Sequence, residues 1–109
     1  MKNCRNLFSG LSEVAQKESV LDLVKEGPVR IQRIISHGQT SPPGFWYDQD
    51  EHEWVAVLSG QAVLQIEGRE EEAALRPGDT LHLPPHLKHR VKWTDPLQPT
   101  VWLAVFWRS

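Results

Sequence analysis

Two blocks of strand-type sequence, each anchored by a turn glycine, constrain the fold of this 109-residue chain more than any other feature. The first block begins at Glu53, continues through apolar and β-branched residues and ends at Gly60. The second begins at Gly78, passes two consecutive prolines and reaches His89. Each block therefore carries one polar residue, Glu53 or His89, that strand alternation could direct inward.

The chain from residue 29 onward reads as short strands separated by turns. Strands are expected at residues 29–37, 54–58, 62–66, 72–75, 80–83, 89–93 and 100–107, and a loop rich in proline and glycine is expected at residues 38–44. This many short strands with turn signals between them indicate an all-β sandwich or jelly-roll barrel.

Residues 12–26 are predicted to form the only helix. A serine can cap its start, a loose apolar stripe recurs near helical spacing, and a Gly-Pro pair follows its last residue. We therefore expect residues 1–28 to form a short helical segment packed on a barrel made by residues 29–109.

The two blocks resemble the signature motifs of the cupin superfamily. In the first motif, Glu53 and Gly60 match the family's Glu-x6-Gly spacing, but no histidine stands where the family has His-x-His. Depending on the number of intervening residues, those two ligand positions fall on Tyr47 and Gln49 or on Trp46 and Asp48.

In the second motif, Gly78, Pro84 and His89 match the family pattern, whereas His86 replaces a glycine and Trp93 an asparagine. The resemblance covers roughly residues 29–107 and is closest to small bacterial single-domain cupins. It implies a double-stranded β-helix, the cupin jelly-roll barrel, with a binding site in the lumen.

An inward Glu53 would be a lone carboxylate in an apolar lumen, which is costly without a partner. One solution is a divalent metal ion such as manganese, iron or zinc, held by Glu53 and His89. The third ligand would be Gln49 or Asp48, with Tyr47 as a less favoured choice. A second is a direct pair between Glu53 and His89, which with Tyr47 would act as acid and base on a ligand. A third is that the pair only hydrogen-bonds inside an empty barrel.

Four further residues are expected to contribute to the ligand pocket. They are Tyr47, Trp46 and Trp93, as aromatic walls, and His86, at the rim in the loop that contains the two prolines. Large aromatic rings in place of imidazoles would narrow the lumen, which favours a small, partly apolar ligand.

The resemblance implies a small metal-binding cupin with oxygenase- or isomerase-like chemistry on a small organic molecule. The alternative is a non-catalytic cupin that binds a small ligand, or regulates another process, without a metal. The missing His-x-His argues against oxygenase sites built on three histidines. Metal analysis of the purified protein separates these two hypotheses.

Composition and charge exclude several other classes of protein. The net charge of −2 and the pI of about 6.2 come without a basic stripe, so no nucleic-acid partner is expected. No apolar run approaches the ~20 residues of a membrane span, and the first residues lack the apolar region of a signal peptide. With Cys4 as the only cysteine, these features predict a cytoplasmic protein.

The closing run, residues 101–107, is apolar on both faces of the expected strand. One face belongs to the core, so the other, which is expected to carry Trp102 and Phe106, needs a cover. Either a second copy of the chain or the N-terminal helix would supply it, and we expect a homodimer.

Overall fold

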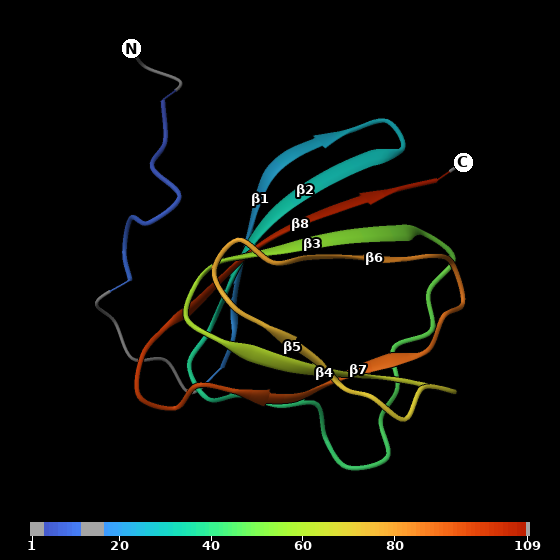
Figure 1. The fold of residues 1–109 in the computed structure, drawn as a ribbon. Helices are drawn as coiled ribbons and strands as arrows, with labels where there is room; N and C mark the ends of the chain where they lie inside the picture. Colours follow the sequence, from blue (N-terminus) through green and yellow to red (C-terminus); the bar gives the residue numbers. More distant parts are fainter. Residues whose placement is uncertain (1–3, 12–16, 109) are drawn as a thin grey trace.

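In the computed structural model, which describes residues 4–11 and 17–108, the chain forms two antiparallel β-sheets that face each other (Figure 1). The strands are β1 (Ser19–Glu26), β2 (Val29–Ser36), β3 (His52–Ser59), β4 (Ala62–Ile66), β5 (Ala73–Leu75), β6 (Thr80–Leu83), β7 (His89–Thr94) and β8 (Thr100–Trp107). The larger sheet has the order β1-β2-β8-β3-β6 and the smaller one β5-β4-β7. The predicted all-β barrel of short strands is therefore confirmed.

The predicted N-terminal helix is wrong over residues 19–26, which form β1 instead; residues 12–16 of that prediction lie outside the described residues. β1 pairs with β2 from Ser19–Ile35 to Glu26–Val29, so the two strands form a hairpin. The Gly-Pro pair that was expected to end a helix makes its turn, with Gly27 at a φ of +56°. A loose apolar stripe is compatible with a helix or with a strand. Here residues 19–26 form a strand because β2 supplies the hydrogen-bond partners of their backbone. The part of the chain that the structure describes contains no helix, and so none that could cross a membrane.

The hydrophobic core lies between the two sheets and follows the predicted alternation of β3. Its buried cluster consists of Val55, Val57, Ala62, Leu64, Leu75 and Trp102. β8 is central to the larger sheet because it pairs with β2 on one side and with β3 on the other. Glu53, two residues before Val55, consequently points toward the same interior as the core.

A β-bulge interrupts the alternation of β7. Val63 pairs with Trp93 while Leu64 pairs with Val91, which leaves Lys92 as an extra residue. As a result Thr94 is 1% exposed and Trp93 is 39% exposed. The expectation that Trp93 shares the inward face of His89 and Val91 is therefore wrong, because one inserted residue reverses the side that follows it.

Two turn positions explain features of the family motifs. Gly60 has a φ of +82°, and a Cβ at this position would lie 2.5 Å from the Thr100 hydroxyl oxygen, so no larger residue fits without displacement. His86, which replaces the family's glycine, keeps the left-handed conformation with a φ of +63°. The backbone thus retains the motif geometry where the side chain has changed.

The loop at residues 38–44 is tied along β7. The Ser41 amide donates to the Val91 carbonyl at 2.9 Å, and the Val91 amide donates to the Ser41 hydroxyl at 3.0 Å. The Thr94 hydroxyl donates to the Gln39 carbonyl at 2.7 Å. These bonds guide the chain that follows the loop, including Tyr47, alongside the inward-facing end of β7.

Candidate functional site

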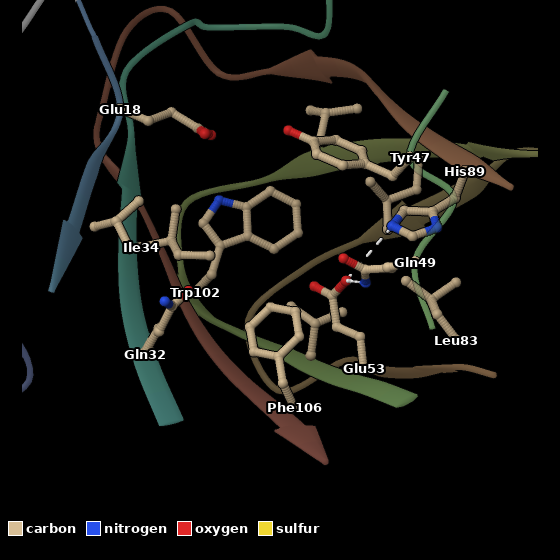
Figure 2. A pocket seen from close by; sticks show the side chains of 14 residues that line it. Glu18, Gln32, Ile34, Tyr47, Gln49, Glu53, Leu83, His89, Trp102 and Phe106 are labelled. Carbon is tan, nitrogen blue, oxygen red and sulfur yellow. Dashed lines mark hydrogen bonds and ion pairs between the residues drawn. The ribbon is translucent and has the colours of Figure 1, made fainter. Parts of the chain in front are cut away.

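A cavity of about 210 Å³ lies between the two sheets (Figure 2). Most of its lining is apolar, but five acidic, amide or hydroxyl side chains and one imidazole point into it. The lining residues are Glu18, Val20, Gln32, Ile34, Tyr47, Gln49, Glu53, Val55, Leu64, Leu83, His89, Val91, Trp102 and Phe106. The volume lies below the ~300–1,000 Å³ typical of drug-sized ligand sites, so the cavity suits a small molecule.

Glu53 and His89 meet in this lumen from opposite sheets (Figure 2). The His89 Nε2 atom lies 3.5 Å from the Glu53 Oε1 atom, and the Gln49 side-chain amide donates to the same oxygen at 2.8 Å. His89 Nδ1 lies 3.0 Å from the Leu87 carbonyl, which can only accept, so Nδ1 carries a proton. Both contacts to Glu53 use Oε1, and no described side chain hydrogen-bonds its Oε2 atom.

The protonation of His89 depends on this arrangement. Burial alone would lower the pKa of its imidazole, but the hydrogen bonds to Glu53 and to the Leu87 carbonyl, together with the charge of Glu53, raise it overall. The protonated form of His89 is therefore favoured more in this site than in water.

Tyr47 covers one face of this pair. Its ring stacks on the His89 imidazole at a centroid distance of 5.4 Å and meets Phe45 edge-on at 4.9 Å. Burial raises the pKa of its phenol, and the charges of Glu18 and Glu53 raise it further. The hydroxyl consequently stays protonated and can donate to a ligand.

Glu18 is the lining residue that the sequence prediction missed most clearly, because it lay in the expected helix. The Trp102 indole N–H donates to the Ser36 hydroxyl at 3.0 Å, and that hydroxyl donates to the Glu18 carboxylate at 2.5 Å. Gln32 was also missed. The expectation that Trp102 and Phe106 lie on the face away from the core is wrong, because both are buried and line the lumen, on the side where alternation along β8 places them.

Of the eight predicted site residues, the structure brings four together in the lumen: Glu53, His89, Gln49 and Tyr47. The other four do not line it. Asp48 and His86 form an exposed pair with 2.8 Å between Oδ1 and Nδ1, and Trp93 faces outward behind the bulge of β7. Trp46 is half-buried away from the lumen. Asp48 and Gln49 diverge because consecutive strand-like residues point to opposite sides.

The side chains present do not fit the predicted resident divalent metal. Catalytic metal sites commonly use at least three protein ligands. Around His89 the lumen offers this one imidazole, the Glu53 carboxylate and the Gln49 amide, which already donates to that carboxylate, whereas the second carboxylate, Glu18, lies across the cavity (Figure 2). Within residues 4–11 and 17–108, no group of three histidine, cysteine, aspartate or glutamate side chains is placed to hold a metal ion. The phenol and amide that replace the family's two imidazoles explain this difference.

Comparison with known families identifies the class of protein. The model of the cupin domain family matches residues 33–106, and the chain therefore belongs to that family. A search of curated proteins finds no match.

Solved structures agree with this assignment. A protein from Ralstonia eutropha JMP134, provisionally assigned as a mannose-6-phosphate isomerase, is 48% identical over 97% of this chain and 98% of its own, with a TM-score of 0.94. A cupin superfamily protein from Desulfitobacterium hafniense DCB-2 is 16% identical over 91% of this chain and 84% of its own, with a TM-score of 0.73. The second likeness concerns the fold alone.

Proposed function

We propose that the lumen binds a small organic molecule and that Glu53, paired with His89, exchanges a proton with it without a resident metal. The observation that carries the proposal is the Glu53–His89 pair inside a mostly apolar cavity. A carboxylate in such surroundings needs partners, and here both partners occupy one oxygen and leave the other available to a ligand.

The roles of the side chains follow from their donors and acceptors. Glu53 Oε2 is the general base, because it is the oxygen of the Glu53–His89 pair that no described residue of the protein hydrogen-bonds. His89 supplies the compensating proton from Nε2, and the Tyr47 hydroxyl donates to an oxygen of the ligand. Gln49 holds Glu53 in place through its 2.8 Å hydrogen bond.

The relative from Ralstonia eutropha supports isomerase-like chemistry as the reaction class. Interconversion of an aldose and a ketose moves a proton between neighbouring carbon atoms, and this transfer requires one base and one acid. The two side chains of this lumen that could do so are Glu53 and His89. The lumen has no positively charged side chain to bind the phosphate of a sugar phosphate, since no lysine or arginine is among its fourteen described lining residues.

Deuterium exchange tests the proposed proton transfer. The EDTA-treated protein is incubated in D₂O with mannose, mannose 6-phosphate and small α-hydroxy aldehydes, and NMR follows deuterium at the carbon beside the carbonyl. We expect incorporation that Glu53→Gln abolishes and that Glu70→Gln, an exposed carboxylate outside the lumen, leaves unchanged.

Two other results would contradict the proposal. Exchange that appears only after Mn²⁺ or Zn²⁺ is added would show a metal-dependent site. Ligand binding without any exchange would identify a binding protein, the non-catalytic alternative.

A further inference from the structure

Resting on this proposed function, we infer that the lumen selects an organic cation: Glu18 and the aromatic walls hold an ammonium group, and Glu53 and His89 act on the other end of the molecule. The ligand class is a small primary or secondary amine with an apolar body. This inference names a recognition residue, Glu18, outside both family motifs.

The first observation that favours a cationic ligand is the negative charge of the lumen. Two carboxylates, Glu18 and Glu53, line it against one histidine, so the lumen is negative whether His89 is protonated or neutral. A cavity with this excess of carboxylate attracts cations and repels phosphates and carboxylates.

Three positively charged side chains near the lumen, Arg30, Arg90 and Lys17, do not line it and so do not cancel its negative charge. Arg30 lies 4.2 Å above the Phe106 ring but pairs with Glu51 at 3.0 Å, and it does not line the lumen. Arg90 donates to the Ser41 and Pro42 carbonyls of the loop beside β7. Lys17 lines a neighbouring hollow that shares Glu18, Tyr47 and Val91 with the lumen, but Lys17 itself does not line the lumen and forms no ion pair with Glu18.

Glu18 is an exposed residue that lines the cavity, and one hydrogen bond holds its carboxylate. Its carboxylate accepts the Ser36 hydroxyl proton on Oε2, and the same hydroxyl accepts the Trp102 indole N–H. The chain of two bonds anchors one carboxylate oxygen and leaves the other for an ammonium N–H, whose charge-assisted hydrogen bond is about twice as strong as a neutral one.

Aromatic faces lie between the two carboxylates. Figure 2 shows Glu18 near the Tyr47 hydroxyl and the Trp102 ring, with Glu53 across the cavity near Phe106. The faces of tryptophan and tyrosine rings attract cations through their ring quadrupole. Burial raises the Tyr47 pKa, and both carboxylates add to this effect, so their fields reach the same part of the lumen.

A matched set of ring compounds tests the inference by calorimetry at pH 7. Benzylamine is cationic, benzyl alcohol is neutral and benzoate is anionic, while the ring is constant. We expect benzylamine to bind at least about tenfold more tightly than benzyl alcohol, and benzoate not to bind, because one charge-assisted bond exceeds a neutral one by about this factor.

Substitutions of Glu18 test whether this residue is responsible for the preference for a cation. Glu18→Gln should weaken benzylamine about tenfold and leave benzyl alcohol unchanged. Glu18→Asp, which keeps the charge on a shorter side chain, should retain part of the preference, and the exposed Glu70→Gln is the matched control. Thermal denaturation of each variant verifies that it is folded.

Equal or tighter binding of benzyl alcohol or benzoate would overturn the cation selectivity while leaving a functional lumen. Unchanged benzylamine affinity in folded Glu18→Gln and Glu18→Asp would overturn the role of Glu18. Failure of all three compounds to bind would overturn the cation inference, whereas deuterium exchange remains the independent measure of proton transfer.

Discussion

Tyr47 and His89 are joined both through the backbone and through their rings. The Tyr47 amide donates to the His89 carbonyl at 2.7 Å, the His89 amide donates to the Tyr47 carbonyl at 3.2 Å, and the rings stack within 21° of parallel. The segment in which Tyr47 and Gln49 stand in place of the family's two histidines therefore still lies against His89. The phenol ring replaces a metal ligand with a cover that orients the imidazole.

This contact gives a prediction for Tyr47. Tyr47→Phe keeps the stacked ring and should unfold at nearly the same urea concentration as the wild type. Tyr47→Ala removes the stack and should cost about 1–2 kcal/mol, moderated by the ring's 38% exposure. Equal stability of the alanine and phenylalanine variants would contradict a role of the ring in holding His89.

The raised pKa of His89 predicts a pH-dependent stability. The usual pKa of a histidine is 6.5, and the folded state raises it through Glu53 and the Leu87 carbonyl against the effect of burial. The stabilisation is fully present below pH 6.5 and is lost as pH rises through the folded-state value. Urea unfolding from mildly acidic to alkaline pH should show this loss in the wild type.

The matched controls for the pH effect are His89→Gln and His86→Gln. His89→Gln should flatten the pH profile over this range. His86→Gln should retain it, since His86 is exposed and pairs with Asp48 outside the lumen. A profile that rises with pH in the wild type would contradict the assigned direction.

The turn at Gly60 predicts a large local cost for an added methyl group. Gly60→Ala would place a Cβ 2.5 Å from the Thr100 hydroxyl oxygen at a positive φ and should cost about 3 kcal/mol. Gly78→Ala is the control: its φ of +92° is also unfavourable, but nothing lies within 4 Å of the added Cβ, so about 1 kcal/mol is expected. Chemical denaturation compares the two, and equal losses would show that the Thr100 contact relaxes freely.

The outer side of the larger sheet predicts a homodimer. β1 is an edge strand, and its outward residues Leu21 and Val24 are 37% and 40% exposed. On the same side, Leu103 and Val105 of the closing strand are half-buried. A second copy covering this surface would protect both the free edge and the apolar side chains.

Sedimentation velocity at micromolar concentration should therefore show a dimer for the wild type. Leu21→Lys combined with Val24→Lys should shift it to a monomer, whereas Lys25→Ala, on the same strand but without loss of apolar surface, should not. A monomeric wild type would contradict the prediction and leave the outer face to the N-terminal residues.

The barrel could be predicted because spacing and alternation are local properties of the sequence. Strand alternation placed Glu53 and His89 in the lumen. The motif spacing placed Gly60 at a turn. The link between Glu18 and Trp102 through Ser36 could not be predicted, because it depends on β1 being a strand and on the pairing of β2 with β8. Asp48 and Gln49 were left as alternatives, since only the backbone pairing of Tyr47 with His89 decides which of the two points inward.

The extra residue at Lys92 divides β7 into two segments with opposite phase. Before Lys92, the side chains of His89 and Val91 face the lumen. After it, Trp93 faces the solvent, although it is four residues from His89 and regular alternation would place it inside. Related sequences compared by strict alternation would therefore assign the last residues of this strand to the wrong side. Deleting Lys92 would leave Val91 and Trp93 as direct neighbours opposite Leu64 and Val63, with Trp93 still outside and Thr94 still inside. The length of β7 can therefore vary by one residue at this point without changing which side chains face the interior.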